Sequence, residues 1–173
     1  MKRWSKLQRQ LYTIIDPTIK FQIQCRIYAM DSECGSTGLP RYWITLGREV
    51  IWDYPRQFVD TSHPQRVHPT CYPYDTDISA ISELIREYID TPRNQLLSKH
   101  FENDHWGLIN ILRAADSRVG SRQWPRLMKK THNAAALTVL ERRMSRKAFG
   151  ISDPGAYKSE RTKIHGLNLN GQE

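Results

Sequence analysis

The sequence predicts an α+β domain: an N-terminal helix, a short antiparallel sheet of at least three strands, then a C-terminal group of helices. Three observations support this class. Apolar residues follow a helical period at the start, a period of two in the next stretch, and a helical period again from about residue 78. Strands grouped before helices favour α+β over the alternating order that is typical of a parallel sheet.

The first element is an amphipathic helix that ends at Asp16-Pro17. A residue before a proline is disfavoured in the helical conformation, so the helix cannot continue through Asp16. Its apolar residues recur at steps of three or four along the chain: Trp4, Leu7, Leu11 and Ile14.

The clearest strand follows, with apolar residues at alternate positions from Ile19 to Ile27. A hairpin comes next, in which residues 41–46 and 49–54 flank Gly47-Arg48, a pair that suits a type II′ turn. That turn predicts three cross-strand pairs: Leu46 with Glu49, Ile44 with Ile51, and Trp43 with Trp52. Both faces of the hairpin then carry large apolar groups. Either both faces are covered, which the stabilising effect of aromatic cross-strand pairs favours, or Trp43 and Trp52 lie on an exposed binding surface.

Residues 55–75 hold four prolines and predict an irregular crossing. Asp75 or Asp77 can cap a helix that ends near Asp90, and Thr91-Pro92 has the pattern of a new helix start that leads to Leu96 and Leu97.

Two further helices complete the domain. One begins near Asp104 and buries four apolar residues before Gly120: Leu108, Ile111, Leu112 and Ala115. The other covers about 133–147, with these residues on its inner side: Ala134, Leu137, Leu140 and Met144. Residues 1–147 therefore form a single domain, and residues 148–173, which lack periodicity, form a loosely ordered tail.

Composition predicts a cytoplasmic protein. No apolar run of the 173 residues approaches the roughly 18–20 that span a bilayer, and no apolar stretch follows the basic start as in a secretory signal. The three cysteines, Cys25, Cys34 and Cys71, are irregularly spaced and are expected to be free thiols in a reducing compartment.

The excess positive charge lies in one stretch, residues 113–147. Ten basic residues face two acidic ones there, Asp116 and Glu141, and this net charge of +8 equals that of the whole chain. Concentrated charge of this kind attracts polyanions. We therefore expect non-enzymatic binding of nucleic acid or another polyanion by this stretch, with Trp124 as a stacking surface. The basic residues are Arg113, Arg118, Arg122, Arg126, Lys129, Lys130, Arg142, Arg143, Arg146 and Lys147.

Asp116 leaves two interpretations open. It forms a local ion pair with Arg113 or with an arginine across the turn, or it orients Arg118 toward a ligand phosphate. Residues 106–147 also resemble a helix–turn–helix motif, in which a short helix, a glycine turn and further helices follow one another. However, Ala115 and Gly120 are five residues apart, whereas the usual DNA-binding pattern has four. Pro125 would also fall in the second helix. Both features weaken a major-groove interpretation.

Two alternatives to polyanion binding remain. One is a protein-interaction module that uses an aromatic sheet face, with Trp43, Trp52 and Tyr54, and meets an acidic partner through the basic residues. The other is a small enzyme without a recognisable signature, which would use a cluster at the start of a helix: Glu102, Asp104 and His105. Helix capping by these carboxylates is the competing explanation.

No metal or cofactor is expected. His63, His68 and Cys71 share one loop, but no second pair of ligands follows to complete a zinc site. The motifs of nucleotide-binding loops, serine hydrolases and zinc proteases are absent from the sequence.

Three stretches resemble a family of small uncharacterised bacterial proteins. They run over residues 3–8, 35–44 and 106–120, and include the motifs Arg-Trp-Ser-Lys-Leu-Gln, Leu-Pro-Arg-Tyr-Trp-Ile and Ala-Ala-Asp-x-Arg-x-Gly. The resemblance extends to about residue 147, and Ser117, Ser121 and Pro125 depart from the family's more basic run. It implies a cytoplasmic bacterial protein and brings no activity with it.

Overall fold

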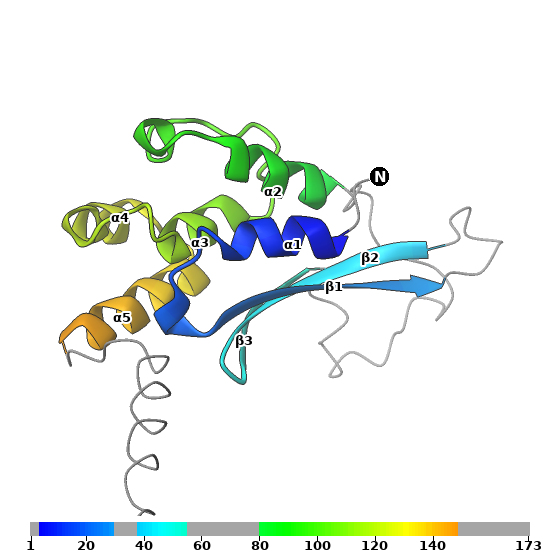
Figure 1. Cartoon of the computed structure of the whole chain (residues 1–173), viewed down its shortest axis with the longest axis horizontal. Coiled ribbons are helices and arrows are strands. Elements are labelled where there is room, and N and C mark those ends of the chain that lie inside the picture. The colour runs from blue at the N-terminus through cyan, green and yellow to red at the C-terminus, as the bar shows by residue number, and fades with distance from the viewer. Residues whose placement is uncertain (1–3, 30–37, 55–79, 149–173) are drawn as a thin grey trace, which may run out of the picture.

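The computed structural model describes residues 4–29, 38–54 and 80–148, which form an antiparallel sheet and a group of helices (Figure 1). The predicted α+β class is confirmed. The elements are α1 (Trp4–Tyr12), η1 (Pro17–Ile19), β1 (Phe21–Ala29), β2 (Gly38–Leu46), β3 (Glu49–Tyr54), α2 (Ala80–Asp90), η4 (Arg93–Gln95), α3 (Leu108–Ala115), η5 (Ser121–Gln123), α4 (Trp124–Lys130) and α5 (Ala134–Ala148).

Several predictions concern residues outside these ranges. They are the crossing at 55–75, the caps at Asp75 and Asp77, and the tail from residue 149 onward. Among the residues that are described, no helix combines the length and the apolar character that a bilayer span requires.

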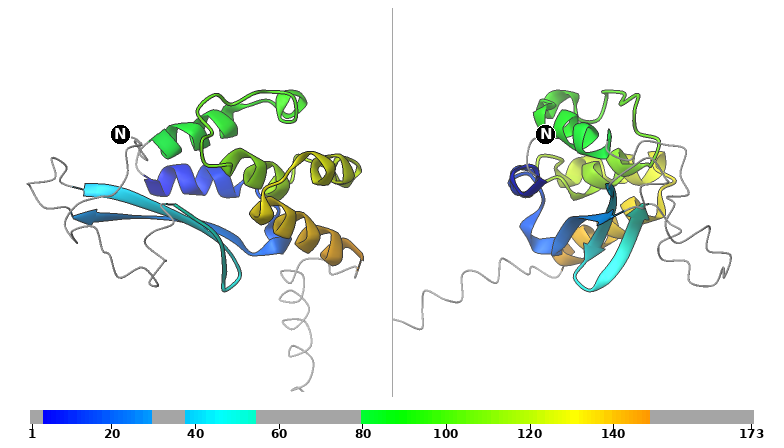
Figure 2. Two further views of the ribbon diagram at one scale, coloured as in Figure 1. Left: turned by 180° about the vertical axis from the view of Figure 1, so that it is seen from behind. Right: turned by 90° about the vertical axis from the view of Figure 1, so that its right-hand side faces the viewer.

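The helices are layered on the sheet, with α1 between the sheet and α2 (Figures 1 and 2). The sheet has the strand order β1-β2-β3, and its inner face buries Phe21, Ile23, Ile44 and Leu46. The alternation predicted for β1 fails at its end, where Ile27 is 67% exposed. The paired ends of β1 and β2 extend past α1, so no described helix covers Ile27 (Figure 1).

The predicted hairpin is present, but two of its three pairs are wrong. Leu46 pairs with Glu49 as expected, whereas Ile44 pairs with Trp52 and Trp43 with Asp53. The register shifts between Ile44 and Thr45, where β3 holds one extra residue. Such a β-bulge cannot be read from turn chemistry, because the turn fixes only the pairs next to it.

The turn itself agrees with the prediction. Gly47 has a φ of +64°, and Lys20 is the only non-glycine described residue with positive φ, so φ at Arg48 is negative. Type II′ turns have this combination, and it explains why glycine stands first in the pair.

The two hairpin tryptophans are half-buried, which lies between the two alternatives set by the sequence. Trp52 packs against the core, and its indole N–H donates to the Trp106 carbonyl at 3.2 Å. Tyr54 stacks on Trp52 with ring centroids 6.3 Å apart and meets Trp106 edge-on at 5.7 Å. The Trp43 ring instead lies under the Arg41 guanidinium, 5.2 Å from its carbon.

The helix predicted from Thr91-Pro92 is wrong, because only the short turn η4 forms there. The Thr91 hydroxyl donates back to the Glu87 carbonyl at 2.7 Å at the end of α2, and Pro92 is extended. Leu96 is the one fully buried residue in 92–98, so this segment has no apolar face that would stabilise a longer helix.

The predicted inner face of the last helix is right for Leu140, and Leu137 is half-buried, but it is wrong for Ala134 and Met144. Ala134 is exposed and Met144 is 40% exposed, while the following residues of α5 are buried: Ala135, Ala136, Val139, Leu140 and Arg143. Small alanines let α5 pack closely on α3, which rotates the helix and brings Arg143 inward. Sequence reasoning placed this arginine in solvent, and Met144 inside, because buried arginines are rare.

Arg143 joins three separate segments at the centre of the helical half. Its side chain is 3% exposed, and its Nε donates to Asp16 Oδ2 at 2.9 Å. The two Nη groups donate to the carbonyl oxygens of Ala114, at 2.8 Å, and Val119, at 3.3 Å. Its guanidinium carbon lies 4.6 Å from the Trp124 ring centroid. Burial lowers the pKa of Arg143, which Asp16 partly offsets.

The loss of Arg143 should therefore destabilise the fold. Arg143→Met keeps an apolar stem but removes the cation beside Asp16 and the hydrogen bonds to Asp16 Oδ2 and the Ala114 carbonyl, so we expect the free energy of unfolding to fall by about 3 kcal/mol. Urea denaturation measures this. Its exposed neighbour offers a matched control, because Arg142→Met should change stability by no more than about 0.5 kcal/mol. Equal effects of the two substitutions would contradict the structural role.

The same ion pair should make stability depend on pH. Burial acts to raise the pKa of Asp16, but the hydrogen bonds from Thr18 and the charge and hydrogen bond of Arg143 outweigh burial and hold this pKa below its ordinary value. The ionised carboxylate then stabilises the fold above the unfolded pKa, and this stabilisation disappears as pH falls through the folded pKa. Asp16→Asn should be less stable than wild type at neutral pH, and the difference should shrink below about pH 4. Urea denaturation at stepped pH tests this; a difference that is constant with pH would refute it.

Candidate functional site: a basic groove

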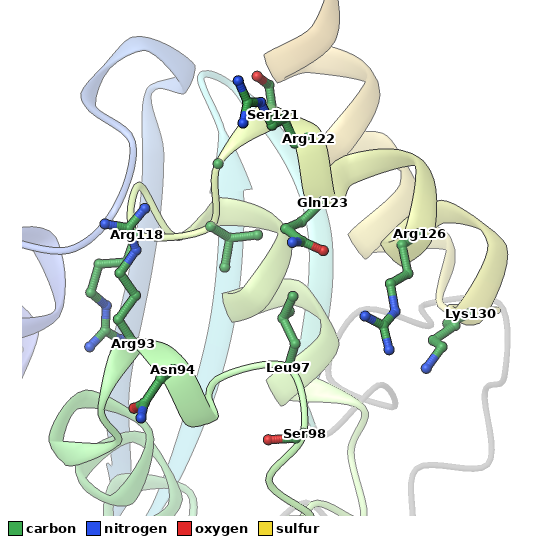
Figure 3. Close-up of a pocket in the computed structure, with 12 residues that line it drawn as sticks. Arg93, Asn94, Leu97, Ser98, Arg118, Ser121, Arg122, Gln123, Arg126 and Lys130 are labelled. Atoms are coloured by element: carbon green, nitrogen blue, oxygen red, sulfur yellow. The ribbon is translucent and has the colours of Figure 1, made fainter.

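An open groove of about 1200 Å³ runs between the η4 turn and α4. Two stretches of the chain line it: residues 93–98 around η4, and residues 118–130, which run from the turn after α3 through η5 into α4 (Figure 3). We call it the basic groove. Its lining residues are Arg93, Asn94, Leu97, Ser98, Arg118, Val119, Gly120, Ser121, Arg122, Gln123, Arg126 and Lys130.

Positive charge dominates the basic groove. Its lining includes four arginines and one lysine and no acidic residue. Like charges gathered on a concave surface focus the electrostatic potential and attract anions. In Figure 3, Arg93 and Arg118 lie on one side of the groove, Arg126 and Lys130 lie on the other, and Leu97 and Gln123 lie between them.

Asp116 fixes one of these cations in place. It directly follows α3, its side chain is fully buried, and it accepts hydrogen bonds from Arg118 Nε at 3.0 Å and Nη2 at 2.7 Å, both at Oδ2. The backbone N–H of Arg118 also donates to Asp116 Oδ1 at 2.7 Å. Asp116 therefore forms a local ion pair, and its partner is Arg118. The side chain of Arg118 lines the groove, so the orientation of this arginine is set by Asp116.

Two residues of the preceding helical segment complete this network. The Tyr88 hydroxyl donates to Asp116 Oδ2 at 2.8 Å, and Arg118 Nη1 donates to the Thr91 carbonyl at 3.0 Å. Burial acts to lower the pKa of Arg118, but the hydrogen bond and charge of Asp116 outweigh it and raise that pKa. Burial, with Asp116, raises the pKa of Tyr88 well above its ordinary value, so this hydroxyl stays a donor at neutral pH.

Two of the predicted binding arginines serve the fold and lie outside the groove lining. Arg143 is buried as described above. Arg113 is half-buried and donates to the carbonyl oxygens of Leu96 and Lys99, both at 2.6 Å, and its guanidinium carbon lies 5.5 Å from the Phe101 ring centroid. Burial lowers the pKa of Arg113.

The structure places Trp124 where bases cannot stack on it. Its side chain is 7% exposed, its indole N–H donates to the Val119 carbonyl at 3.2 Å, and its ring lies close to the cationic ends of Arg143 and Lys147. A stacking surface needs an open ring face, and this ring is part of the core.

The other predicted cations divide between two surfaces. Arg118, Arg122, Arg126 and Lys130 come together in the basic groove, whereas Lys129 is exposed on α4 outside its lining. On α5, Arg142, Arg146 and Lys147 do not line the groove. Lys147 donates to the hydroxyl of Ser121 at 2.6 Å and so lies at the edge of the groove.

Sequence reasoning missed Arg93 and its neighbours Asn94, Leu97 and Ser98. The first 112 residues carry no net charge, so nothing in the charge profile singles out this arginine. Thr91-Pro92 does indicate a turn at this position in the sequence. That this turn lies next to residues 118–130 depends on tertiary packing, which the sequence pattern does not show.

In the cluster at residues 102–105, the carboxylate of Asp104 has a structural role. Asp104 caps α3, because its carboxylate accepts the backbone N–H groups of Leu108 at 2.8 Å and Ile109 at 3.0 Å. His105 is exposed beside Trp106, and Glu102 is exposed. Burial raises the pKa of the Cys25 thiol, which disfavours the reactive thiolate.

No cluster of metal-ligating residues occurs among residues 4–29, 38–54 and 80–148. The histidines and cysteines of the predicted loop, His63, His68 and Cys71, lie outside these ranges, as does Cys34.

The network beneath Arg118 predicts a measurable stability effect. Tyr88→Phe keeps the buried ring but removes a donor to an ionised carboxylate, so we expect a loss of about 1–3 kcal/mol in the free energy of unfolding. Tyr12→Phe is the control, because the Tyr12 hydroxyl bonds only neutral groups, the Ile23 N–H and carbonyl and the Gln8 amide, and Tyr12 is 37% exposed, so water can replace these bonds. Chemical denaturation compares the two; an equal or smaller loss for Tyr88→Phe would argue against the network.

A family model matches residues 3–144, which run from the first helix into the last and include the whole basic groove. No curated protein and no solved structure matches the chain. Since the family match covers far more than half of its length, the chain belongs to the SF0329 protein family.

Proposed function

We propose that this protein binds nucleic acid through the phosphate backbone, which lies in the basic groove. One observation supports this most strongly: Arg93 and four cations of residues 118–130, two stretches that are distant in the sequence, converge on one open surface without an acidic residue in its lining. Phosphate contacts supply most of the affinity of sequence-independent nucleic-acid binding, and they come from surfaces of this kind.

The side-chain types in the groove favour phosphate over a diffuse anionic surface. Arginine outnumbers lysine four to one in the lining, and the planar guanidinium donates two parallel hydrogen bonds to phosphate oxygens. Neutral donors, namely Asn94, Ser98, Ser121 and Gln123, lie among the arginines. Such groups commonly bind phosphate and sugar oxygens beside the charged ones.

The groove favours binding to the backbone over reading of bases. None of its lining residues is aromatic, and base stacking on aromatic rings is the usual basis of single-strand recognition. We accordingly expect little sequence preference. The sequence-based expectation of a cytoplasmic bacterial protein belongs to this proposal, since nucleic acid is abundant in that compartment.

This proposal moves the contact surface away from α5. The sequence hypothesis included Arg142, Arg143 and Arg146, but Arg143 is in the core and the other two lie outside the groove lining. The polyanion class of ligand stays, and the residues that bind it change.

Two double variants with equal loss of charge test this choice. Arg126→Ala with Lys130→Ala removes two groove cations, and Arg142→Ala with Arg146→Ala removes two from α5. We expect only the groove pair to weaken binding of a fluorescein-labelled 20-base-pair DNA strongly, about tenfold or more in fluorescence anisotropy. The slope of log K against log salt should fall by about 1.8 for the groove pair, or 0.9 for each phosphate contact.

The other outcomes are also decisive. A larger effect of the α5 pair would place the contact on α5 and refute the groove. No binding by wild type at low salt, to DNA or RNA of either strandedness, would refute nucleic acid as the ligand and favour an acidic protein partner.

A further inference from the structure

Arg118 differs from every other cation of the basic groove in how firmly it is held. Three of its guanidinium N–H groups donate to Asp116 and to the Thr91 carbonyl, and its guanidinium carbon lies 5.7 Å from the Tyr88 ring centroid. A guanidinium has five N–H groups, so these bonds leave one on each Nη. The side chain is 22% exposed, and it lines the groove.

The other groove cations have no such support. Within the described part of the chain, Arg93, Arg122, Arg126 and Lys130 form no side-chain hydrogen bond or ion pair, and all four are exposed. Each of these side chains would lose rotamer freedom when it binds a ligand. That ordering costs about 0.5–1.5 kcal/mol for each immobilised side chain.

We propose that Arg118 is a preorganised phosphate-binding residue of the basic groove, which we call the fixed seat. Its two remaining Nη N–H groups donate to a backbone phosphodiester of a nucleic acid. Arg126 and Lys130, on the other side of Leu97 and Gln123, form a second and adaptable contact. This inference rests on the proposed function and assigns unequal roles to cations that a purely electrostatic groove would treat alike.

The buried carboxylate explains why the seat depends on geometry more than on charge. Asp116 compensates much of the Arg118 charge, so long-range attraction comes mainly from the unpaired cations. What Arg118 contributes is a planar donor whose orientation is set before the ligand arrives. Preorganised groups of this kind bind without the ordering cost that flexible ones incur.

Lysine substitution separates the two contributions, because it keeps the charge and removes the planar fork. We expect Arg118→Lys to weaken DNA binding about tenfold and Arg126→Lys less than about twofold in fluorescence anisotropy. Both variants should keep the wild-type dependence of affinity on salt, since the number of phosphate contacts that carry charge is unchanged. Equal effects of the two lysine substitutions would overturn the fixed seat while leaving groove binding in place.

A second variant covers the case in which Arg118→Lys fails to fold, which a thermal melt would reveal. Tyr88→Phe leaves Arg118 and every groove cation present but removes one of the bonds that hold Asp116. We expect a two- to fivefold loss of affinity, of order 0.4–1 kcal/mol. Tyr88 does not line the groove, so this substitution would affect the ligand only through Arg118. Unchanged affinity of a folded Tyr88→Phe protein would overturn the proposal.

A measurement on the wild-type protein gives an independent check. Inorganic phosphate, titrated into ¹⁵N-labelled protein, should shift the Arg118 Nε–H signal, assigned by its loss in Arg118→Lys, before the other arginine signals. Shifts of equal size at all groove arginines would contradict a fixed seat. If wild type binds neither phosphate nor DNA, the proposed function itself fails.

Discussion

The arrangement of the helical half depends on one buried negative charge, Asp116. A carboxylate without solvent must be paired or hydrogen-bonded, and this one is satisfied by Tyr88 of α2 and by both the backbone and the side chain of Arg118. The turn that contains it also bonds to the chain after α1, because Ser117 N–H donates to the Ile14 carbonyl at 2.7 Å and Asp16 N–H to the Ala115 carbonyl at 2.8 Å. These bonds hold α1, α2 and α3 in one relative position.

The positive charge of residues 113–147 therefore has two uses. Arg113 and Arg143 bind carbonyl oxygens that the turns between helices leave unpaired, and Arg143 also neutralises Asp16. Their charges are directed into the protein. Four cations of the groove lining, Arg93, Arg122, Arg126 and Lys130, are instead exposed to solvent, so they place positive charge on one open surface. Arg118 combines both uses, since it supports a buried carboxylate and reaches the surface.

Sequence patterns predicted the elements better than their contacts. Period and turn chemistry located α1, β1, the hairpin, α2, α3 and α5, because these signals are local. They failed where long-range packing decides: the bulge between Ile44 and Thr45, and the rotation of α5 that buries Arg143. For the site, the charge profile supplied Arg118, Arg122, Arg126 and Lys130, but Arg93 comes from a neutral stretch and joins them only through tertiary structure.

Arg118 follows Asp116 by two residues, and this spacing lets one carboxylate bind both the backbone and the side chain of Arg118. The carboxylate accepts the backbone N–H of Arg118, which closes a tight local turn, and it also holds the guanidinium of the same residue. Asp116 thus lies at the end of α3, stabilises the turn that follows and orients the Arg118 guanidinium. Under the proposed function, a ligand that binds Arg118 therefore contacts a rigid part of the fold, and a substitution that loosens Asp116 is expected to lower stability and binding together. Under the proposed function, stability and ligand affinity are coupled through these shared hydrogen bonds, so Tyr88 contributes to binding although it does not line the groove.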